Sequence, residues 1–230
     1  MNIFRFFLLF FILITQVQAN TIYNLIKIPN LEIYENNAVN KLRYLYAIKP
    51  FRLGVNLEKN IQCSNSDKVT LDDKFKIISK NLNRYSLKFL KKINLKYIVL
   101  CENLSVSKIN TAGIPNNLTR TLIIDVKFNK NYLERGIHHE VFHMINDSHK
   151  ELFSEEEWKT FNNKDFKYSE CSTCNNNWNL ELYNKTDGFL TEYAKSTASE
   201  DMAEIFSHLI FYKNKTYIND PIIEKKNKIY

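Results

Sequence analysis

Glycine and proline are both scarce in this chain, which has four of each among its 230 residues. No two glycines lie close enough to form a GxGxxG or GxxxxGK(S/T) loop, so the sequence excludes the common nucleotide-binding signatures. Because tight hairpins usually draw on residues with positive φ, the same scarcity disfavours an all-β sandwich rich in turns. We therefore expect helices combined with some sheet.

The chain also lacks an apolar run long enough to span a bilayer, which needs about 20 residues. Its N-terminal apolar run, Phe6–Ile14, follows the basic residue Arg5 and is followed by small residues at Val17 and Ala19. This pattern is typical of a secretory signal peptide, and we predict cleavage after Ala19. We accordingly expect a secreted or periplasmic protein without stable membrane insertion.

Concentrated positive charge is absent as well, although the net charge is +7. The lysines are spread along the chain and form no arginine-rich stripe or basic-aromatic motif. We interpret the excess as a solvated surface and expect no nucleic-acid partner. The apolar content, 44%, is high enough to build a buried core and excludes wholesale disorder.

Cysteine occurs at only four positions: Cys63, Cys101, Cys171 and Cys174. An even number in an exported protein favours disulfides, either Cys63–Cys101 with Cys171–Cys174 or a crossed pairing. The Cys-Ser-Thr-Cys segment also suggests a redox motif or half of a zinc knuckle. Three asparagines follow it instead of a helix, and no second Cys/His pair stands at knuckle spacing. We favour a disulfide that staples a loop.

The first half of the chain is predicted to mix strands with one long helix. Residues 20–65 alternate in short apolar stretches and are expected to form strands and loops. Apolar positions recur at helical spacing from 71 to about 93, behind Thr70 as a candidate N-cap. β-branched runs predict two further strands, at 96–101 and 121–126.

The second half is predicted to be mainly helical. Apolar stripes favour helices at 131–146 and 198–212, and a shorter one at 155–161 lies within a long polar loop. Three of the five histidines gather on the first of these helices, so this part of the chain is the candidate for metal binding or catalysis.

Residues 139–143 read His-Glu-Val-Phe-His and match the pattern HExxH. Helical geometry places His139 and His143 one above the other on one face, where both imidazoles can reach one zinc ion. Glu140 can then reach a water on that ion without displacing it. The alternative is a pair of ordinary histidines on an amphipathic helix, and the clustering of histidines weakens it.

A catalytic zinc needs a third protein ligand, which should come from a different element, and an open position. On the predicted helix 198–212, Glu200 and Glu204 stand at i and i+4 on one face. We predict that Glu200 binds the metal and that Glu204 hydrogen-bonds a ligand histidine. In the alternative, Glu200 completes a capping box with Thr197, and Glu204 lies on a solvated face.

Residues 139–143, Tyr193 and the Glu-x-x-Ala-Glu-x-Phe run at 200–206 together resemble the gluzincin metallopeptidases. The resemblance is to the catalytic domain of anthrax lethal factor and to the secreted Pro-Pro endopeptidases. The stretch 188–194 is also similar to zinc peptidases of gut bacteria. Relatives often carry Phe-Gly or Leu-Gly inside HExxH, whereas this chain has Val-Phe, so the packing beneath the zinc is expected to differ.

The resemblance implies a zincin-like α+β fold, with a small mixed sheet, an active-site helix bearing HExxH and a second helix carrying the third zinc ligand. It implies that Zn²⁺ is bound by His139, His143 and Glu200. It further implies that Glu140 is the base and that Tyr193 donates to the oxyanion.

We therefore expect a secreted zinc endopeptidase that hydrolyses protein or peptide substrates through a zinc-bound water activated by Glu140. The substrate backbone is expected to add as a strand to a sheet edge, for which 121–126 is the candidate. The rival hypothesis is a non-catalytic exported binding or toxin-like module whose structural zinc is closed by Cys171 or Cys174.

The expected domain organisation is a signal peptide over 1–19 followed by one monomeric domain over 20–230. Within that domain, 20–120 forms an N-terminal sheet and helix part, and 121–230 forms the zinc-binding part.

Five other residues receive ordinary interpretations. His138 is expected to face out or pack at the side of its helix, and His149 and His208 to lie at the surface or beside the metal ligands. Trp158 is expected to anchor the core or a loop, and Trp178 lies in the loop that would overhang the cleft.

Overall fold

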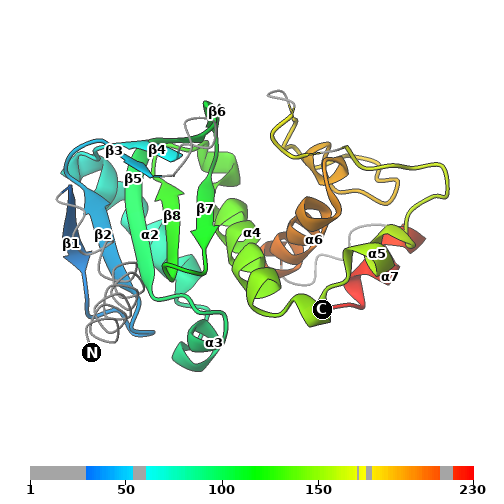
Figure 1. Cartoon of the computed structure of the whole chain (residues 1–230), viewed down its shortest axis with the longest axis horizontal. Coiled ribbons are helices and arrows are strands. Elements are labelled where there is room, and N and C mark those ends of the chain that lie inside the picture. The colour runs from blue at the N-terminus through cyan, green and yellow to red at the C-terminus, as the bar shows by residue number, and fades with distance from the viewer. Residues whose placement is uncertain (1–29, 54–60, 170, 175–177, 213–219) are drawn as a thin grey trace, which may run out of the picture.

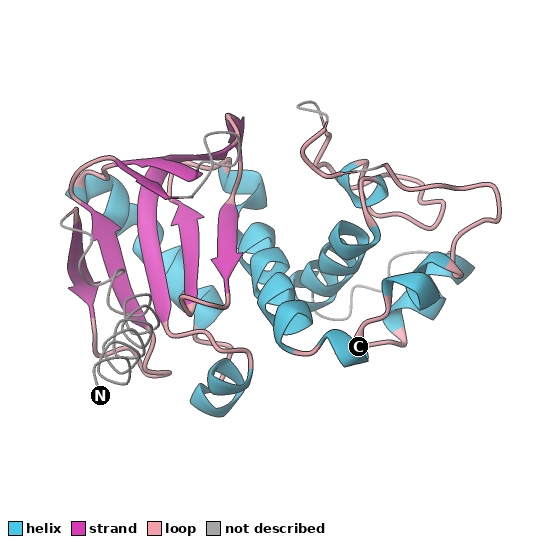
Figure 2. Ribbon diagram, viewed as in Figure 1, coloured by secondary structure: helices cyan, strands magenta, loops and turns pink. Residues whose placement is uncertain are grey.

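The computed structural model describes residues 30–53, 61–169, 171–174, 178–212 and 220–230. The predicted signal peptide lies outside the described residues. Figure 2 shows the strands gathered in one part of the molecule and several helices in the other, which confirms the α+β class. Among the described residues, no helix has the length and apolar character needed to cross a membrane.

The sheet is organised around strand β5 (Tyr97–Val106), which extends the strand predicted at 96–101. The first half of β5 lies between two parallel neighbours, β2 (Arg43–Ala47) and β8 (Thr121–Asp125). Two antiparallel strands complete this layer, β1 (Leu31–Glu35) beside β2 and β7 (Gly113–Asn116) beside β8 (Figure 1).

The expectation that 121–126 offers an open sheet edge is wrong, because β8 is paired on both sides. All five of its residues are buried, as a central parallel strand requires. The strand beyond it, β7, contains Pro115, which has no N–H to donate and is therefore typical of an edge. The edge nearest the HExxH helix is β7.

The second half of β5 pairs with different strands and forms a smaller antiparallel layer. Its neighbours are β4 (Ile61–Ser64) and β6 (Ile109–Asn110), and β4 continues to β3 (Phe51–Leu53). A disulfide between Cys63 and Cys101 ties β4 to β5. The other two cysteines pair with each other across their short loop, so the uncrossed arrangement is the one present.

The single helix predicted over 71–93 is wrong, because two helices occupy this stretch, α2 (Lys68–Leu82) and α3 (Leu87–Lys92). Asp67 caps α2 by accepting a hydrogen bond from the backbone N–H of Thr70, the residue that we expected to be the cap. Ser86 adopts an extended conformation and caps α3, so the chain breaks between two helices that share an apolar face.

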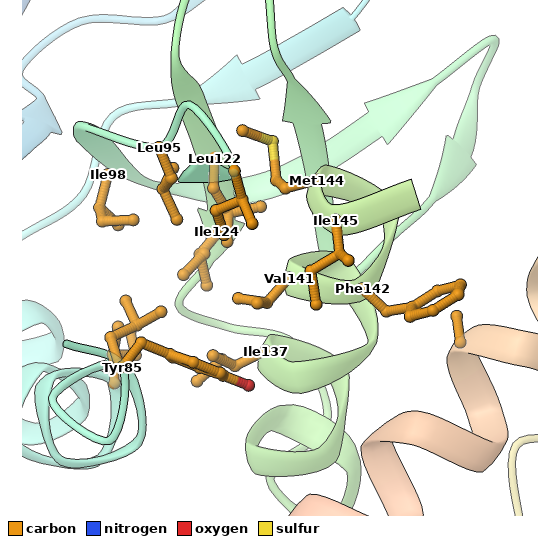
Figure 3. Close-up of a cluster of buried hydrophobic side chains, with 14 of the residues drawn as sticks. Tyr85, Leu95, Ile98, Leu122, Ile124, Ile137, Val141, Phe142, Met144 and Ile145 are labelled. Atoms are coloured by element: carbon orange, nitrogen blue, oxygen red, sulfur yellow. The ribbon is translucent and has the colours of Figure 1, made fainter. Parts of the chain in front are cut away.

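Helix α4 (Lys130–Ser148) carries residues 139–143 and lies between the sheet and α6 (Ala198–Tyr212), which confirms both predicted helices (Figure 1). The two residues inside the HExxH motif face opposite ways. Both belong to one apolar cluster, but Val141 points toward the sheet, whereas Phe142 points away from the sheet (Figure 3) and meets Phe206 of α6 with ring centroids 5.5 Å apart. The HExxH motif is therefore packed between the sheet on one side and α6 on the other.

The C-terminal helix α7 (Pro221–Asn227) is fastened to α6 by a fully buried ion pair. Lys226 Nζ lies 2.6 Å from Asp201 Oδ2 and donates to the Gly188 carbonyl at the same distance. The Asp201 carboxylate also accepts from the indole of Trp158, which lies in α5 (Glu155–Lys159). One oxygen of the Asp201 carboxylate, Oδ2, therefore links α5, α6 and α7.

Candidate active site

Three side chains from two helices converge at the junction of α4 and α6. His139 and His143 stand one turn apart on α4, and Glu200 lies in the first turn of α6. Glu200 Oε2 is 2.8 Å from His139 Nε2 and 3.2 Å from His143 Nε2, and the two Nε2 atoms are 3.2 Å apart. Atoms bound to one tetrahedral zinc at about 2.0–2.2 Å lie about 3.3 Å from each other. The donor set therefore fits a zinc ion.

Glu204 fixes the orientation of His139. Its Oε1 lies 3.0 Å from His139 Nδ1, so Nδ1–H donates to the carboxylate and the lone pair of Nε2 points toward the other two donors. The second carboxylate oxygen accepts from Thr191 Oγ1 at 2.9 Å and lies 3.3 Å from Arg135 Nη1. Glu204 is only 3% exposed and does not lie on a solvated face.

The charges of this cluster depend on one another. Burial by itself would raise the pKa of Glu204, but the Arg135 charge and the bond with His139 hold it below its usual value. Burial would likewise raise the pKa of Glu200, yet the charge of His143 and the bonds with both imidazoles hold it well below its usual value. Both carboxylates are thus held as anions beside the ligand nitrogens.

Glu140 occupies a different setting on the same helix. Burial raises its pKa to about 7, although the neighbouring charges of His139 and His143 act in the opposite direction. Strand β7 approaches it closely, since a Cβ built on Gly113 would lie 2.7 Å from Glu140 Cγ. A carboxyl group with a pKa in this range can both accept and return a proton at neutral pH.

Tyr193 begins a short 3-10 turn before α6, and its ring stacks on His139 with centroids 5.8 Å apart. Burial, together with the charges of Glu200 and Glu140, raises the pKa of Tyr193 well above its usual value. The hydroxyl therefore keeps its proton and serves as a hydrogen-bond donor.

The helix-capping hydrogen bond considered as the alternative role of Glu200 is also present in part. Thr197 Oγ1 accepts a hydrogen bond from the Glu200 backbone N–H at 3.2 Å, which starts α6. The Glu200 carboxylate lies against the two imidazoles, so the backbone and the side chain of this residue have separate partners.

A cavity of about 150 Å³ opens beside these groups. His139, Glu140, Tyr193 and Glu204 form part of its lining. Trp178, which was expected to overhang the cleft, also lines it. The cavity therefore lies against the candidate ligand cluster and offers space for a small chemical group.

The remaining histidines lie outside the metal cluster. His138 does not face out: it is fully buried and lies between the Tyr85 hydroxyl, 2.7 Å from Nδ1, and Asn81 Oδ1, 3.1 Å from Nε2. His149 contacts the carboxylate of Glu151. Since Cys171 and Cys174 form a disulfide, neither supplies a thiolate to close a structural zinc site.

Sequence reasoning missed two participants, Arg135 and Gly113. Arg135 stands at i−4 from His139, so helical spacing alone would have placed it on the same face. Gly113 has no such signal, because its contact with Glu140 depends on the pairing of β7.

A family model described as "Putative zinc-binding metallo-peptidase" matches residues 96–228, more than half of the chain. The matched range runs from β5 to α7 and includes every residue of the cluster, whereas β1 to β4 lie outside it. Neither a curated protein nor a solved structure matches the chain.

Proposed function

This chain belongs to that family of zinc-binding metallo-peptidases, and we propose that it is a secreted endopeptidase of the gluzincin type, related to the lethal factor catalytic domain and the Pro-Pro endopeptidases. In this proposal, residues 1–19 are a signal peptide and 20–230 form one zincin-like domain. The domain acts as a monomer on protein or peptide substrates, outside the cell or in the periplasm. The observation that carries the proposal is the convergence of three ligand side chains beside the buried carboxyl group of Glu140.

Zinc held by His139, His143 and Glu200 would supply a Lewis acid that polarises the scissile carbonyl and acidifies a water molecule. Glu140 accepts a proton from the attacking water and returns it to the leaving amine, a task suited to its raised pKa. Tyr193 donates its hydroxyl hydrogen to the negative charge that develops on the carbonyl oxygen.

The substrate backbone adds as a further strand to the edge at β7. This placement is supported by the close approach of Gly113 to Glu140, which brings the edge strand and the base together. Backbone hydrogen bonds to an edge strand hold a peptide in extended form and leave its side chains to determine specificity.

The central test replaces Glu140 with glutamine, which keeps the shape of the side chain and removes its basicity. We expect the Glu140→Gln variant to retain zinc, measured by metal analysis, while cleavage of casein and of a peptide library falls by about 10²–10⁴-fold. Glu134→Gln is the matched control, since Glu134 lies on the same helix and bonds Asn81 instead of lining the cavity. Equal cleavage by the parent and Glu140→Gln would remove Glu140 from the mechanism.

The third ligand is tested by a pair of substitutions that separate the two partners of Glu200. Glu200→Ala is expected to lose most zinc affinity, measured by competition with a chelator. Thr197→Ala removes only the cap and is expected to cost about 1 kcal/mol of stability while zinc affinity stays near that of the parent. If Glu200→Ala binds zinc as tightly as the parent, Glu200 is only a capping residue.

A further inference from the structure

Part of the cavity lining comes from a loop that is closed by a disulfide. Cys171 and Cys174 are bonded to each other, and the two residues between them, Ser172 and Thr173, line the cavity. The indole N–H of Trp178 donates to the Ser172 carbonyl at 3.0 Å. The disulfide, the loop and the aromatic ring are therefore connected into one wall.

The described lining of the cavity is more apolar than polar, although Asn110 and Thr111 add polar groups. Among the described lining residues Arg135 is the one Lys or Arg, but its guanidinium is engaged elsewhere, with Nη1 3.3 Å from Glu204 and Nη2 bonded to the Leu180 carbonyl. The carboxyl groups of the described lining are those of Glu140 and Glu204. The apolar residues of the lining come from the sheet corner, the start of α4 and the loop around Trp178: Val106, Ile109, Ala112, Phe128, Tyr132 and Leu180.

The volume of the cavity sets the size of the group that it accepts. The cavity measures about 150 Å³. An apolar protein cavity of about the same volume binds benzene. A leucine or phenylalanine side chain fits such a space, and an apolar group of that size excludes water from the lining.

We infer that the Cys171–Cys174 loop and Trp178 form one wall of a pocket that receives an apolar substrate side chain next to the scissile bond. The side chain is next to that bond because Glu140 and Tyr193 line the same cavity. The inference rests on the proposed function and deepens it, since it assigns the side-chain preference to this wall. The disulfide limits the conformations of the loop and so holds Ser172 where the indole can bond it.

The test compares peptides that differ only at the residue next to the cleaved bond, with Phe, Leu, Ala or Asp at that position. We expect the parent to prefer Phe or Leu to Ala by about 10–100-fold in kcat/KM, the range that an apolar pocket gives. Trp178→Ala and the double variant Cys171→Ser/Cys174→Ser should each lower that preference by roughly 10-fold. Both should bind as much zinc as the parent, because neither change touches a ligand.

Two further variants separate the wall from general effects on the fold. Trp178→Phe keeps an aromatic ring and loses only the bond to Ser172, so it should fall between the parent and Trp178→Ala. The double variant Cys63→Ser/Cys101→Ser removes the disulfide that lies outside the cavity lining and should keep the preference of the parent even where its stability falls.

Each result decides between the two proposals. If the parent cleaves these peptides and the wall variants keep its full preference, the wall inference is overturned and the endopeptidase stands. A parent that prefers Asp also overturns it, because Arg135 would then be reachable. If the zinc-loaded parent cleaves no peptide, both proposals fall together.

Discussion

The two sides of helix α4 bury different kinds of surface. On the sheet side, apolar side chains such as Leu122, Ile124 and Val141 form a continuous cluster (Figure 3). On the α6 side, apolar side chains such as Phe142 are joined in the interior by charged or titratable groups, including His139 and Glu204. Apolar burial stabilises a fold in proportion to area, whereas buried charges are tolerated only when they are paired. We therefore expect the stability of the fold to fall when buried volume is removed on the sheet side, and when one member of a charged pair is removed on the α6 side.

The largest effect on stability is expected where a buried carboxylate loses the cationic partner that it has among the described residues. Lys226→Met keeps most of the side-chain volume but leaves the Asp201 carboxylate buried without its ion pair. Breaking one partner of such a pair costs about 3–5 kcal/mol, and we expect a loss of this size in urea unfolding.

The double variant Lys226→Met/Asp201→Asn is the control for this prediction. It removes the uncompensated charge, so part of the lost stability should return, and the coupling is read from the double-mutant cycle. Additive losses would show that the Lys226–Asp201 pair is not what stabilises this region.

On the sheet side, Leu122→Ala should destabilise the fold through a different cause. Leu122 is fully buried on the central strand β8, so its truncation leaves a cavity and costs about 2–5 kcal/mol. Zinc affinity of the folded variant should match the parent, because the ligands lie on the other side of α4. A fall in zinc affinity as large as that of Glu200→Ala would contradict the separation of the two sides.

The parts of this structure that could be predicted from sequence are those specified by local spacing. The stripe on 198–212 and the i, i+4 placement of Glu200 and Glu204 survive into the structure because a helix turns a fixed spacing into a shared face. The same reasoning placed His139 and His143 together on α4.

The parts that could not be predicted depend on partners distant in sequence. The apolar repeat over 71–93 continues across a break, because Tyr85 is held there by His138 and faces the same core as the two flanking helices. The open edge at β7 depends on strand order, which short apolar runs do not encode. Local periodicity therefore identifies which residues share one face of a helix or strand, but it does not identify which other element packs against that face.

Gly113 is where the two sides meet, because it is a sheet residue in close contact with Glu140, the base in the proposed mechanism. In Gly113→Ala the new Cβ would lie 2.7 Å from Glu140 Cγ and 3.0 Å from the Ile123 carbonyl oxygen, so Glu140 must shift. Displacement of a base by about 1 Å costs roughly 100-fold in rate, and we expect a loss of that order in peptide cleavage with zinc retained.

Ile114→Ala is the matched control for Gly113→Ala. It weakens the same strand from the next position, where the side chain packs against a separate apolar cluster that includes Val99 and Ile123. It should lower stability with little loss of cleavage by the folded protein. Similar cleavage losses in the two variants would mean that β7 acts through stability rather than through Glu140.

The smallest effect is expected at the partner of a ligand rather than at a ligand. Glu204→Gln keeps an oxygen near His139 Nδ1 but removes the charge that also pairs with Arg135, and zinc affinity should fall by about 10–100-fold. Thr191→Val removes only the hydrogen bond from Thr191 to this carboxylate and leaves the contacts with His139 and Arg135, so its zinc affinity should stay closer to the parent. Equal losses in the two variants would mean that Glu204 matters for packing around α6 and not for the basicity and orientation of His139. A larger loss in Glu204→Gln would show that the buried charge on the α6 side acts on the metal ligand itself, which the apolar side of α4 cannot do.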